Sequence, residues 1–322
     1  AGVGRAVAQV LAREGWNLGL IARNAERLEA ARHEAEELGA KAIALPADVA
    51  DAQAVSAAAD KAAETFGGID LWVNAAMATV FAPVHEIAPE EFRRVTEVTY
   101  LGQVHGTLAA LRNMRPRDRG TIVQVGSALA YRSIPLQSAY CAAKFAIRGF
   151  TDSLRSELIH EGSRVRLTMV QFPAVNTPQF DWARARMPRQ PQPVPPIHQP
   201  EAVARHILRA AWEAPRELWL GWPSVRAILG GMLAPGLTDR LAARAAWDGQ
   251  MTQEPARPRG GNLFETVPRQ QGSHGRFDAR ARCRVAGYDP VWLRGALAAL
   301  AVAAPALAWR LGRRAGTPAR LR

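Results

Sequence analysis

Three side chains near the middle of the chain have the chemistry for proton transfer. Tyr140 and Lys144 stand four residues apart, and Ser127 lies thirteen residues before the tyrosine. On a helix this spacing places the phenol and the ammonium on one face, where the cation lowers the pKa of the tyrosine. The pattern predicts a general acid/base, a group that tunes it, and a hydroxyl that can hydrogen-bond an oxygen whose charge changes during reaction.

The elements that must position these residues are a strand, a loop and a helix. Residues 121–125 form an apolar run typical of a buried strand, which Gly126 and Ser127 close. A loop with Pro135 leads into a long helix that carries Tyr140 and Lys144. The structural alternative is an ordinary amphipathic helix with a half-buried tyrosine and a lysine that reaches for solvent.

Composition narrows the class of protein. With 322 residues, 48 % of them apolar, the chain can form one large domain with an extension. Its net charge of +12 is concentrated in residues 240–322, which contain fifteen Arg and five acidic residues. No recognition motif accompanies this charge, so we expect no nucleic-acid partner. Two cysteines and no signal peptide indicate a cytoplasmic protein, and we expect no bound metal.

Strands and helices alternate along the first half of the chain. Strand patterns at residues 16–22, 42–45 and 69–74 are separated by helical patterns at residues 24–38 and 51–66. Short connections of this kind predict an α/β fold with a doubly wound, Rossmann-type parallel sheet, whose ligands bind beyond the carboxyl ends of the strands. Polar residues stand at four of these ends, namely Arg23, Asp48, Asn74 and Ser127.

Several short motifs extend this pattern. Gly2 and Gly4 open the first helix, where backbone N–H groups can approach a pyrophosphate. Asn74-Ala75-Ala76-Met77 follows the strand at 69–74, and Pro173-Ala174 follows an apolar strand at 165–172. Together with Ser127, Tyr140 and Lys144, these motifs resemble the short-chain dehydrogenase/reductase family from Ala1 to about Gly221. The first strand and first glycine of that family are absent, so we expect a truncated start.

The resemblance implies a set of cofactor-binding positions. They are Gly2, Gly4, Asp48, Val49, Asn74, Tyr140, Lys144, Pro173 and Thr177. Charge favours NADP(H) over NAD(H), because Ala22 stands where NAD requires an acidic residue and Arg23 follows with a guanidinium suited to a phosphate. The family often has an asparagine in a proton relay where this chain has Thr99, and a hydroxyl cannot offer a carboxamide's paired donor and acceptor.

The substrate side is expected to involve the Pro-rich residues 173–200, which in the family cap the substrate pocket. Candidate contacts in or near this region are Leu129, Tyr131, Phe172, Phe180, Trp182 and Met187. Aromatic residues in such a lid can also pack beneath it. The pattern thus leaves substrate contact and packing as alternatives for these six side chains.

Residues beyond 222 are expected to form a C-terminal extension of the dehydrogenase-like domain at residues 1–222. Residues 223–248 have a helical pattern, and residues 252–290 are basic and loop-like. Residues 291–314 contain an uncharged apolar stretch, which could lie on a membrane surface or dock on protein. A protein with this extension would be cytoplasmic with or without membrane association.

The expected activity is hydride transfer between NADP(H) and an alcohol or carbonyl substrate, with Tyr140 as general acid/base. The family pairs two long helices across subunits, here residues 90–114 and 137–160, which implies a homodimer or tetramer. The alternative is a non-catalytic nucleotide-sensing or scaffold protein that keeps the fold, and the altered motif at Asn74 and Thr99 motivates it.

Overall fold

Alternating helices and strands form the first part of the structure, a computed structural model that describes residues 1–257, 260–267, 272–293 and 295. Their order confirms the α/β pattern expected from the sequence. The bounds are α1 Gly2–Arg13, β1 Leu18–Ala22, α2 Ala25–Glu37, β2 Ala42–Pro46, α3 Ala52–Phe66 and β3 Leu71–Asn74. Side chains of Asn24 and Asp51 accept hydrogen bonds from the first-turn N–H groups of α2 and α3, which explains why these helices begin there.

The central part of the chain supplies the longer strands and helices. They are α4 Pro89–Thr96, α5 Gly102–Met114, β5 Thr121–Ser127, α6 Ser138–His160, β6 Arg166–Phe172, α8 Pro200–Glu213 and β10 Glu217–Leu220. A π-helical turn, Glu97–Leu101, joins α4 to α5. All seven residues of β5 are buried, as a strand in the middle of a parallel sheet requires.

The strands of the α/β pattern fall into two sheets. β1 pairs with β2, and a five-stranded sheet has the order β13-β10-β6-β5-β3, in which β13 (Gly287–Tyr288) alone is antiparallel. Within the described ranges, no strand lies between β1 and β3. The parallel strands of these sheets match the doubly wound arrangement expected from the sequence.

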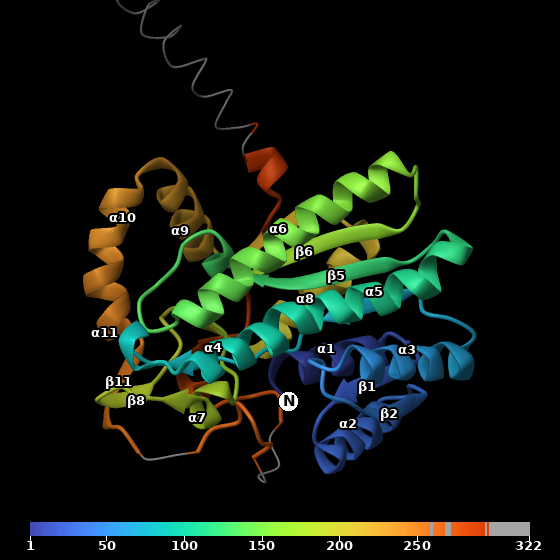
Figure 1. Cartoon of the computed structure of the whole chain (residues 1–322), viewed down its shortest axis with the longest axis horizontal. Coiled ribbons are helices and arrows are strands. Elements are labelled where there is room, and N and C mark those ends of the chain that lie inside the picture. Colours follow the sequence, from blue (N-terminus) through green and yellow to red (C-terminus); the bar gives the residue numbers. More distant parts are fainter. Residues whose placement is uncertain (258–259, 268–271, 294, 296–322) are drawn as a thin grey trace, which may run out of the picture.

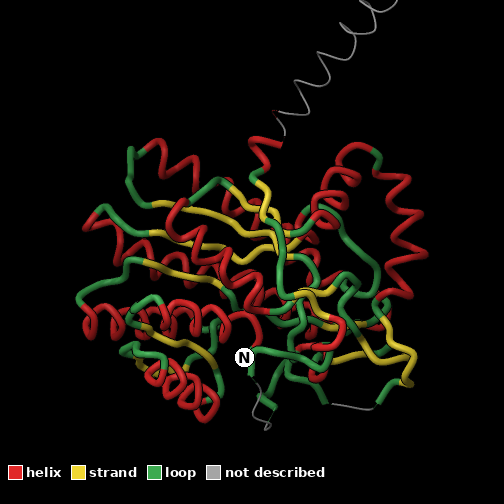
Figure 2. The backbone as a smooth tube through the Cα atoms, turned by 180° about the vertical axis from the view of Figure 1, so that it is seen from behind, coloured by secondary structure: helices red, strands yellow, loops and turns green. Residues whose placement is uncertain are grey.

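Helices cover both faces of the large sheet. Residues of α1 and α8 pack with Val123, Val125 and Val170 in one apolar cluster. On the opposite face, residues of α3, α5 and α6 pack with Ile122 and Leu167. Figure 1 shows α5 and α6 in front of β5 and β6, and Figure 2 shows the molecule from behind. This three-layer arrangement is the one that a doubly wound sheet requires.

Short elements complete the region after β6. They are α7 Gln179–Trp182, β7 Arg184–Ala185, β8 Arg189–Pro191 and β9 Ile197–His198, and β7 pairs with β4 (Val80–Phe81). The extension begins with α9 Trp222–Leu233, α10 Pro235–Leu241 and α11 Trp247–Gly249, as its helical pattern predicts. Its later part pairs with the body of the molecule: β11 (Met251–Pro255) with β8, β12 (Ala281–Arg282) with β9, and β13 with β10. The extension therefore shares sheets with residues 1–222.

The apolar stretch that we expect within residues 291–314 lies mostly outside the described residues. Among the residues that the structure does describe, no helix has both the length and the apolar character needed to cross a bilayer.

Candidate active site

Ser127 ends β5 with its hydroxyl at the carboxyl edge of the sheet. Its backbone N–H donates to Gln171 Oε1 at 2.8 Å, and its Oγ accepts from Leu129 N–H at 3.1 Å. Gly126 is required here, because a Cβ at this position would lie 2.2 Å from Gln171 Oε1. The strand end is thus fixed by contacts on both sides, and the serine hydroxyl lies close enough to Tyr140 to influence the pKa of its phenol.

Helix α6 holds Tyr140 and Lys144 on the face that meets β5. Lys144 Nζ donates to the carbonyl oxygen of Val125 at 2.6 Å and lies 5.5 Å from the centre of the Tyr140 ring. The lysine side chain is only 1 % exposed. The structure therefore places Ser127, Tyr140 and Lys144 together, as their spacing predicts.

The electrostatic state of this group differs from the prediction. Burial lowers the pKa of Lys144 to about 7. Burial also raises the pKa of Tyr140 above its ordinary value, and the hydrogen bond with Ser127 only partly opposes this. The predicted lowering of the tyrosine pKa by Lys144 is therefore not found. The physical reason is that the ammonium is as poorly solvated as the phenol, so it is partly neutral near pH 7.

Thr99 lies in the π-helical turn and is fully buried. Its hydroxyl accepts from Ala78 N–H and donates to the Ala78 carbonyl oxygen, both at 2.9 Å. Both hydrogen-bonding functions of the hydroxyl are thus used by the backbone of one residue, and the expected effect of Thr99 on a proton relay stays a prediction. Nearby, Gln103 Nε2 donates to the same Val125 carbonyl that Lys144 binds, at 3.1 Å. Gln103 Oε1 is buried and has no partner among the described residues.

Arg23 follows β1, close to Asp48 and Arg94. Arg94 pairs with the Asp48 carboxylate, whose other oxygen accepts from Ala50 N–H at 3.0 Å. Burial opposes ionisation of Asp48, but these two hydrogen bonds outweigh it and hold its pKa below the usual range. The sequence reading missed Arg94; its position on α4, facing Asp48 across the site, has no signal in local spacing.

The guanidinium of Arg23 is bound by the protein's own backbone. Its nitrogens donate to the carbonyl oxygens of Asn262 at 2.6 Å, Phe264 at 3.0 Å and Leu263 at 3.4 Å. Arg94 Nε donates to the Leu263 carbonyl at 3.2 Å. We call residues 260–267 and 272–277 the covering segment. In Figures 1 and 2 it runs past the N-terminus of the chain, close to α7 in Figure 1.

The covering segment also reaches the glycines of α1 and the residues after β6. Gly2 N–H donates to the Gly272 carbonyl at 3.1 Å. Gly275 N–H donates to the Asn176 carbonyl at 3.3 Å, next to the buried Thr177. The covering segment therefore contacts three of the predicted cofactor positions, Gly2, Arg23 and Thr177.

Other predicted cofactor positions have structural partners. The Asn74 side chain donates to Thr107 Oγ1 and Gln124 Oε1, both at 2.9 Å, and accepts from Trp72 Nε1, so its amide serves the interior of the sheet. The Val49 carbonyl oxygen lies 2.9 Å from Nδ1 of His105. Gly4 lies within α1, and a Cβ there would stand 3.9 Å from Ala75. Pro173 directly follows β6.

Most of the predicted substrate contacts are packing residues. Phe172 belongs to the core on the α1 and α8 side of the sheet, and Phe180 and Met187 belong to a separate apolar cluster. Tyr131 donates its hydroxyl to the buried Glu217 carboxylate at 2.6 Å, and Trp182 lies under the guanidinium of Arg27 at 5.4 Å. Leu129 stays next to Ser127, because its N–H binds the serine hydroxyl. For these residues, apart from Leu129, the packing alternative is favoured.

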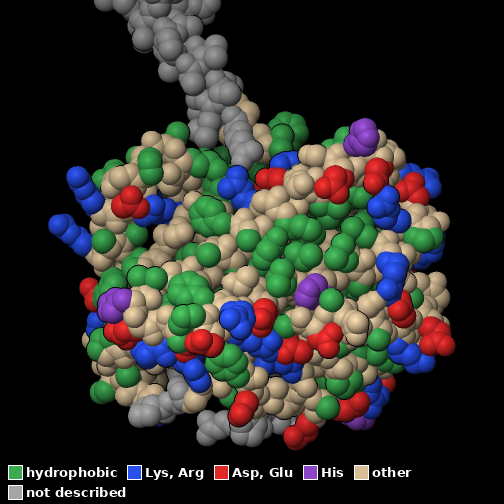
Figure 3. Space-filling model, viewed as in Figure 1, with side chains coloured by type: hydrophobic (Ala, Val, Ile, Leu, Met, Phe, Trp, Pro, Cys, Tyr) green, Lys and Arg blue, Asp and Glu red, His purple; other side chains and the backbone are tan. Residues whose placement is uncertain are grey.

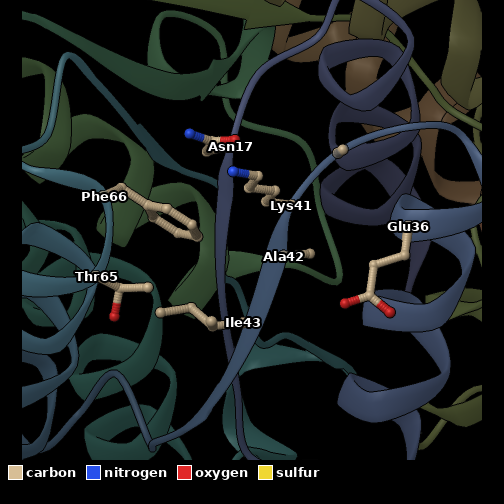
Figure 4. Close-up of a pocket in the computed structure, with 8 residues that line it drawn as sticks. Asn17, Glu36, Lys41, Ala42, Ile43, Thr65 and Phe66 are labelled. Carbon is tan, nitrogen blue, oxygen red and sulfur yellow. The ribbon is translucent and has the colours of Figure 1, made fainter.

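A hollow of about 480 Å³ lies away from this group. Its lining includes Asn17, Lys41 and Phe66, at the amino ends of β1 and β2 and the end of α3 (Figure 4). The carboxyl ends of the strands, where Ser127 and Arg23 lie, are at the opposite edge. Within the described ranges, no three His, Cys, Asp or Glu side chains are grouped closely enough to hold a metal ion.

Comparison with known proteins supports the same interpretation. An uncharacterized oxidoreductase of Bacillus subtilis, YxnA, is 32 % identical over 98 % of this chain and 88 % of its own length, so the similarity includes most of the C-terminal extension. An alcohol dehydrogenase from Thermococcus sibiricus, solved with 5-hydroxy-NADP, is 29 % identical with a TM-score of 0.57, over 68 % of this chain and 91 % of that one.

A short-chain dehydrogenase from Streptomyces avermitilis has a TM-score of 0.62 at 26 % identity, over 77 % of this chain and 96 % of that one. The family model described as short chain dehydrogenase matches residues 1–187. Fold, site geometry and similarity therefore agree, and the chain belongs to the short-chain dehydrogenase family of oxidoreductases.

Proposed function

We propose that this protein is an NADP(H)-dependent oxidoreductase that interconverts an alcohol and a carbonyl compound, with Tyr140 as general acid/base. The observation that carries the proposal is the grouping of Ser127, at the end of β5, with Tyr140 and Lys144 on α6, where the lysine is fixed on the Val125 carbonyl and lies 5.5 Å from the centre of the Tyr140 ring. A protein that only bound nucleotide would need none of these three groups in this arrangement.

The protein's groups divide the acid–base work among them. The cofactor supplies or accepts the hydride when it is bound. Tyr140 donates its phenolic proton to the carbonyl oxygen in reduction and takes it back in oxidation. Ser127 hydrogen-bonds the same oxygen as its charge changes. Lys144 can carry a positive charge or lose it near neutral pH, and this state sets how readily the phenol releases its proton.

Preference for NADP(H) rests on Arg23. Its guanidinium already binds carbonyl oxygens of three residues, so it presents donors in the geometry that a phosphate group accepts. The neighbouring N–H of Gly2 is likewise bound to a carbonyl oxygen. The donors present thus fit the anionic parts of a dinucleotide, with Arg23 suited to a ribose 2′-phosphate. The Thermococcus sibiricus structure, which holds an NADP derivative, is consistent with this choice.

The test is to titrate NADPH and NADH by fluorescence and to follow NADPH oxidation on a panel of aldehydes and ketones. We expect NADPH to bind more tightly, with turnover on at least one class of carbonyl compound. Tyr140→Phe should bind NADPH and lose turnover. Wild-type binding without turnover on any member of the panel would contradict the proposed enzyme.

A non-catalytic nucleotide sensor is the second candidate, and two observations favour it. The covering segment occupies the hydrogen-bonding groups of Arg23 and Gly2, and burial raises the pKa of Tyr140. Both features would be harmless in a protein that responds to nucleotide without turnover. The turnover panel separates the two candidates.

We also propose a homodimer or tetramer that is formed through α5 and α6. Leu108 on α5 is 56 % exposed and Phe145 on α6 is 42 % exposed. Figure 3 shows hydrophobic side chains gathered on the face that these two helices present. An exposed apolar patch of this kind is typical of a subunit interface. Sedimentation of the wild type and of Leu108→Glu should show a larger species that the substitution dissociates.

A further inference from the structure

We infer that the covering segment and the cofactor compete for one site, so that NADP(H) must displace residues 260–267 and 272–277 in order to bind. The inference rests on the proposed cofactor. It assigns a role to a part of the C-terminal extension that lies outside the residues matched by the family model.

The first step is that the segment uses the groups that would hold a dinucleotide. At one end, Arg23 is bound by the carbonyl oxygens of Asn262, Leu263 and Phe264. In the middle, the Gly2 N–H at the start of α1 is bound by the carbonyl oxygen of Gly272. These oxygens are weaker acceptors than phosphate oxygens, but they take the same N–H donors.

The second step is that two arginines, from different elements, converge on one carbonyl. Arg23 follows β1 and Arg94 lies on α4, and both donate to Leu263 O. Two guanidinium groups around a single oxygen form a local site for an anion. We therefore include Arg94 among the groups that would recognise a phosphate once the segment has moved.

The third step is that the far end of the segment lies against the residues that follow β6. Phe277 N–H donates to Asn176 Oδ1 at 3.1 Å, beside Gly275. A Cβ at Gly275 would lie 2.5 Å from the carbonyl oxygen of Thr177, so the backbone lies directly against it. No dinucleotide could contact Arg23, Gly2 and Thr177 together while the segment keeps these positions.

The fourth step concerns what holds the segment in place. Leu263 is 1 % exposed and packs with Ala78, Val80 and Ala139. Asn262 N–H also donates to the Trp182 carbonyl at 3.0 Å. The segment is therefore docked by an apolar anchor and by backbone hydrogen bonds, and the covered form has to open before the cofactor can bind. In that case the apparent dissociation constant is the intrinsic value divided by the open fraction.

A matched pair of glycine substitutions in the full chain tests this. Gly275→Ala should push the segment away, because its Cβ would overlap with Thr177 O, whereas a Cβ at Gly272 meets nothing within 4 Å. We expect Gly275→Ala to bind NADPH about three- to tenfold more tightly than the wild type, and Gly272→Ala to stay within about twofold of it. Neither Gly272 nor Gly275 belongs to the proposed catalytic group. Equal or weaker binding by Gly275→Ala would overturn the inference.

Hydrogen exchange of the unaltered protein gives a second readout that does not depend on the substitution. Addition of NADPH should speed exchange of the amides in residues 260–267 if the segment is displaced, and slow it if the segment closes over the cofactor as a lid. Slower or unchanged exchange with bound NADPH would therefore overturn the competition and leave the proposed enzyme intact. Faster exchange without turnover would support the competition and contradict the enzyme. Failure of both the wild type and Gly275→Ala to bind NADPH would contradict the cofactor assignment and the competition together.

Discussion

The two ends of the candidate site are held by different kinds of contact. At the acid–base end, Ser127, Tyr140 and Lys144 lie on adjacent elements, β5 and α6, and their partners are the sheet itself, through Val125 and Gln171. At the adenosine end, Arg23 takes its partners from residues about 240 positions later in the chain. The first end is a fixed part of the fold, whereas the second can rearrange if the covering segment leaves. If the proposed site and competition are correct, catalytic geometry and cofactor access are controlled by separate parts of the molecule.

The largest loss of activity is expected from changes at Ser127 and Tyr140, the two groups that would contact the reacting oxygen. We expect Ser127→Ala to lower kcat/KM about 10²–10³-fold, because it removes the donor to the reacting oxygen. Tyr140→Phe should lower it about 10²–10⁴-fold through loss of the proton donor. The double variant should be little worse than Tyr140→Phe, since the two groups act as a unit. Steady-state kinetics with NADPH measures all three, and strictly additive losses would show that the residues act independently.

The adenosine end is tested by cofactor preference. Arg23→Ala removes the guanidinium but also frees the covering segment, and the second effect should favour NADPH and NADH alike. The ratio of their dissociation constants isolates the first effect, and we expect the preference for NADPH to fall by about 10–100-fold. Arg93→Ala, at an exposed position on α4, serves as the control. An unchanged ratio in Arg23→Ala would remove the argument for NADP(H).

The same contrast explains what could be predicted from sequence. The strands, the long helices and the proximity of Ser127, Tyr140 and Lys144 followed from local periodicity and short spacing. The interior role of the Asn74 amide, the packing of Tyr131 on Glu217 and the pairing of Arg94 with Asp48 could not, because each depends on contacts between distant elements. The predicted lowering of the pKa of Tyr140 was wrong for a related reason. The spacing gives the distance from Tyr140 to Lys144, but it does not show that the lysine is buried.

The covering segment is the clearest case of such a limit. Residues 260–277 have no helical or strand period, and their composition is typical of a loop. The covering segment, residues 260–267 and 272–277, is positioned by the buried Leu263 and by backbone carbonyl oxygens, which any residue type provides. A signal could have come only from Gly275, whose close approach to Thr177 excludes a larger residue.

Lys144 allows stability to be separated from function at the fixed end. Burial lowers its pKa from an unfolded value of about 10.4 to about 7. Below pH 7 the lysine is charged in both the folded and the unfolded state, so the full penalty of burying the charge reduces the stability of the fold. This penalty fades as the pH rises from about 7 toward 10. We expect Lys144→Met to raise the free energy of unfolding by roughly 1–3 kcal/mol at pH 6, with a smaller gain at pH 9, while turnover is lost.

Urea unfolding at the two pH values measures this difference. The Val125 carbonyl keeps its hydrogen bond from Gln103 in the variant, so the substitution leaves no unpaired acceptor there. Lys61→Met, at an exposed position on α3, should show no comparable change with pH. A variant less stable than the wild type at pH 6 would mean that the buried ammonium is stabilised by its surroundings.

The smallest expected effect concerns a histidine within the covering segment. His274 lies between two carboxylates, with Nε2 2.9 Å from Glu201 and Nδ1 2.6 Å from Asp278. Burial alone would lower its pKa, but the hydrogen bonds and charges of Glu201 and Asp278 outweigh it and raise the pKa above the ordinary value. The protonated imidazole therefore ties residues 272–277 to α8.

The sign of the pH effect follows from this raised pKa. The stabilising contribution of His274 is fully present below its unfolded pKa of about 6.5 and is lost as the pH rises through the higher folded value. The covering segment should then be held less tightly, and NADPH should bind about two- to threefold better at pH 8 than at pH 6 relative to His274→Gln. Lys144 titrates in both the wild type and His274→Gln, so its effect cancels when the two are compared. The variant His160→Gln, at the exposed end of α6, controls for a general loss of positive charge. If wild type and His274→Gln show the same pH dependence of NADPH affinity, the imidazole does not restrain the segment, and only Leu263 and the backbone contacts hold the covered form.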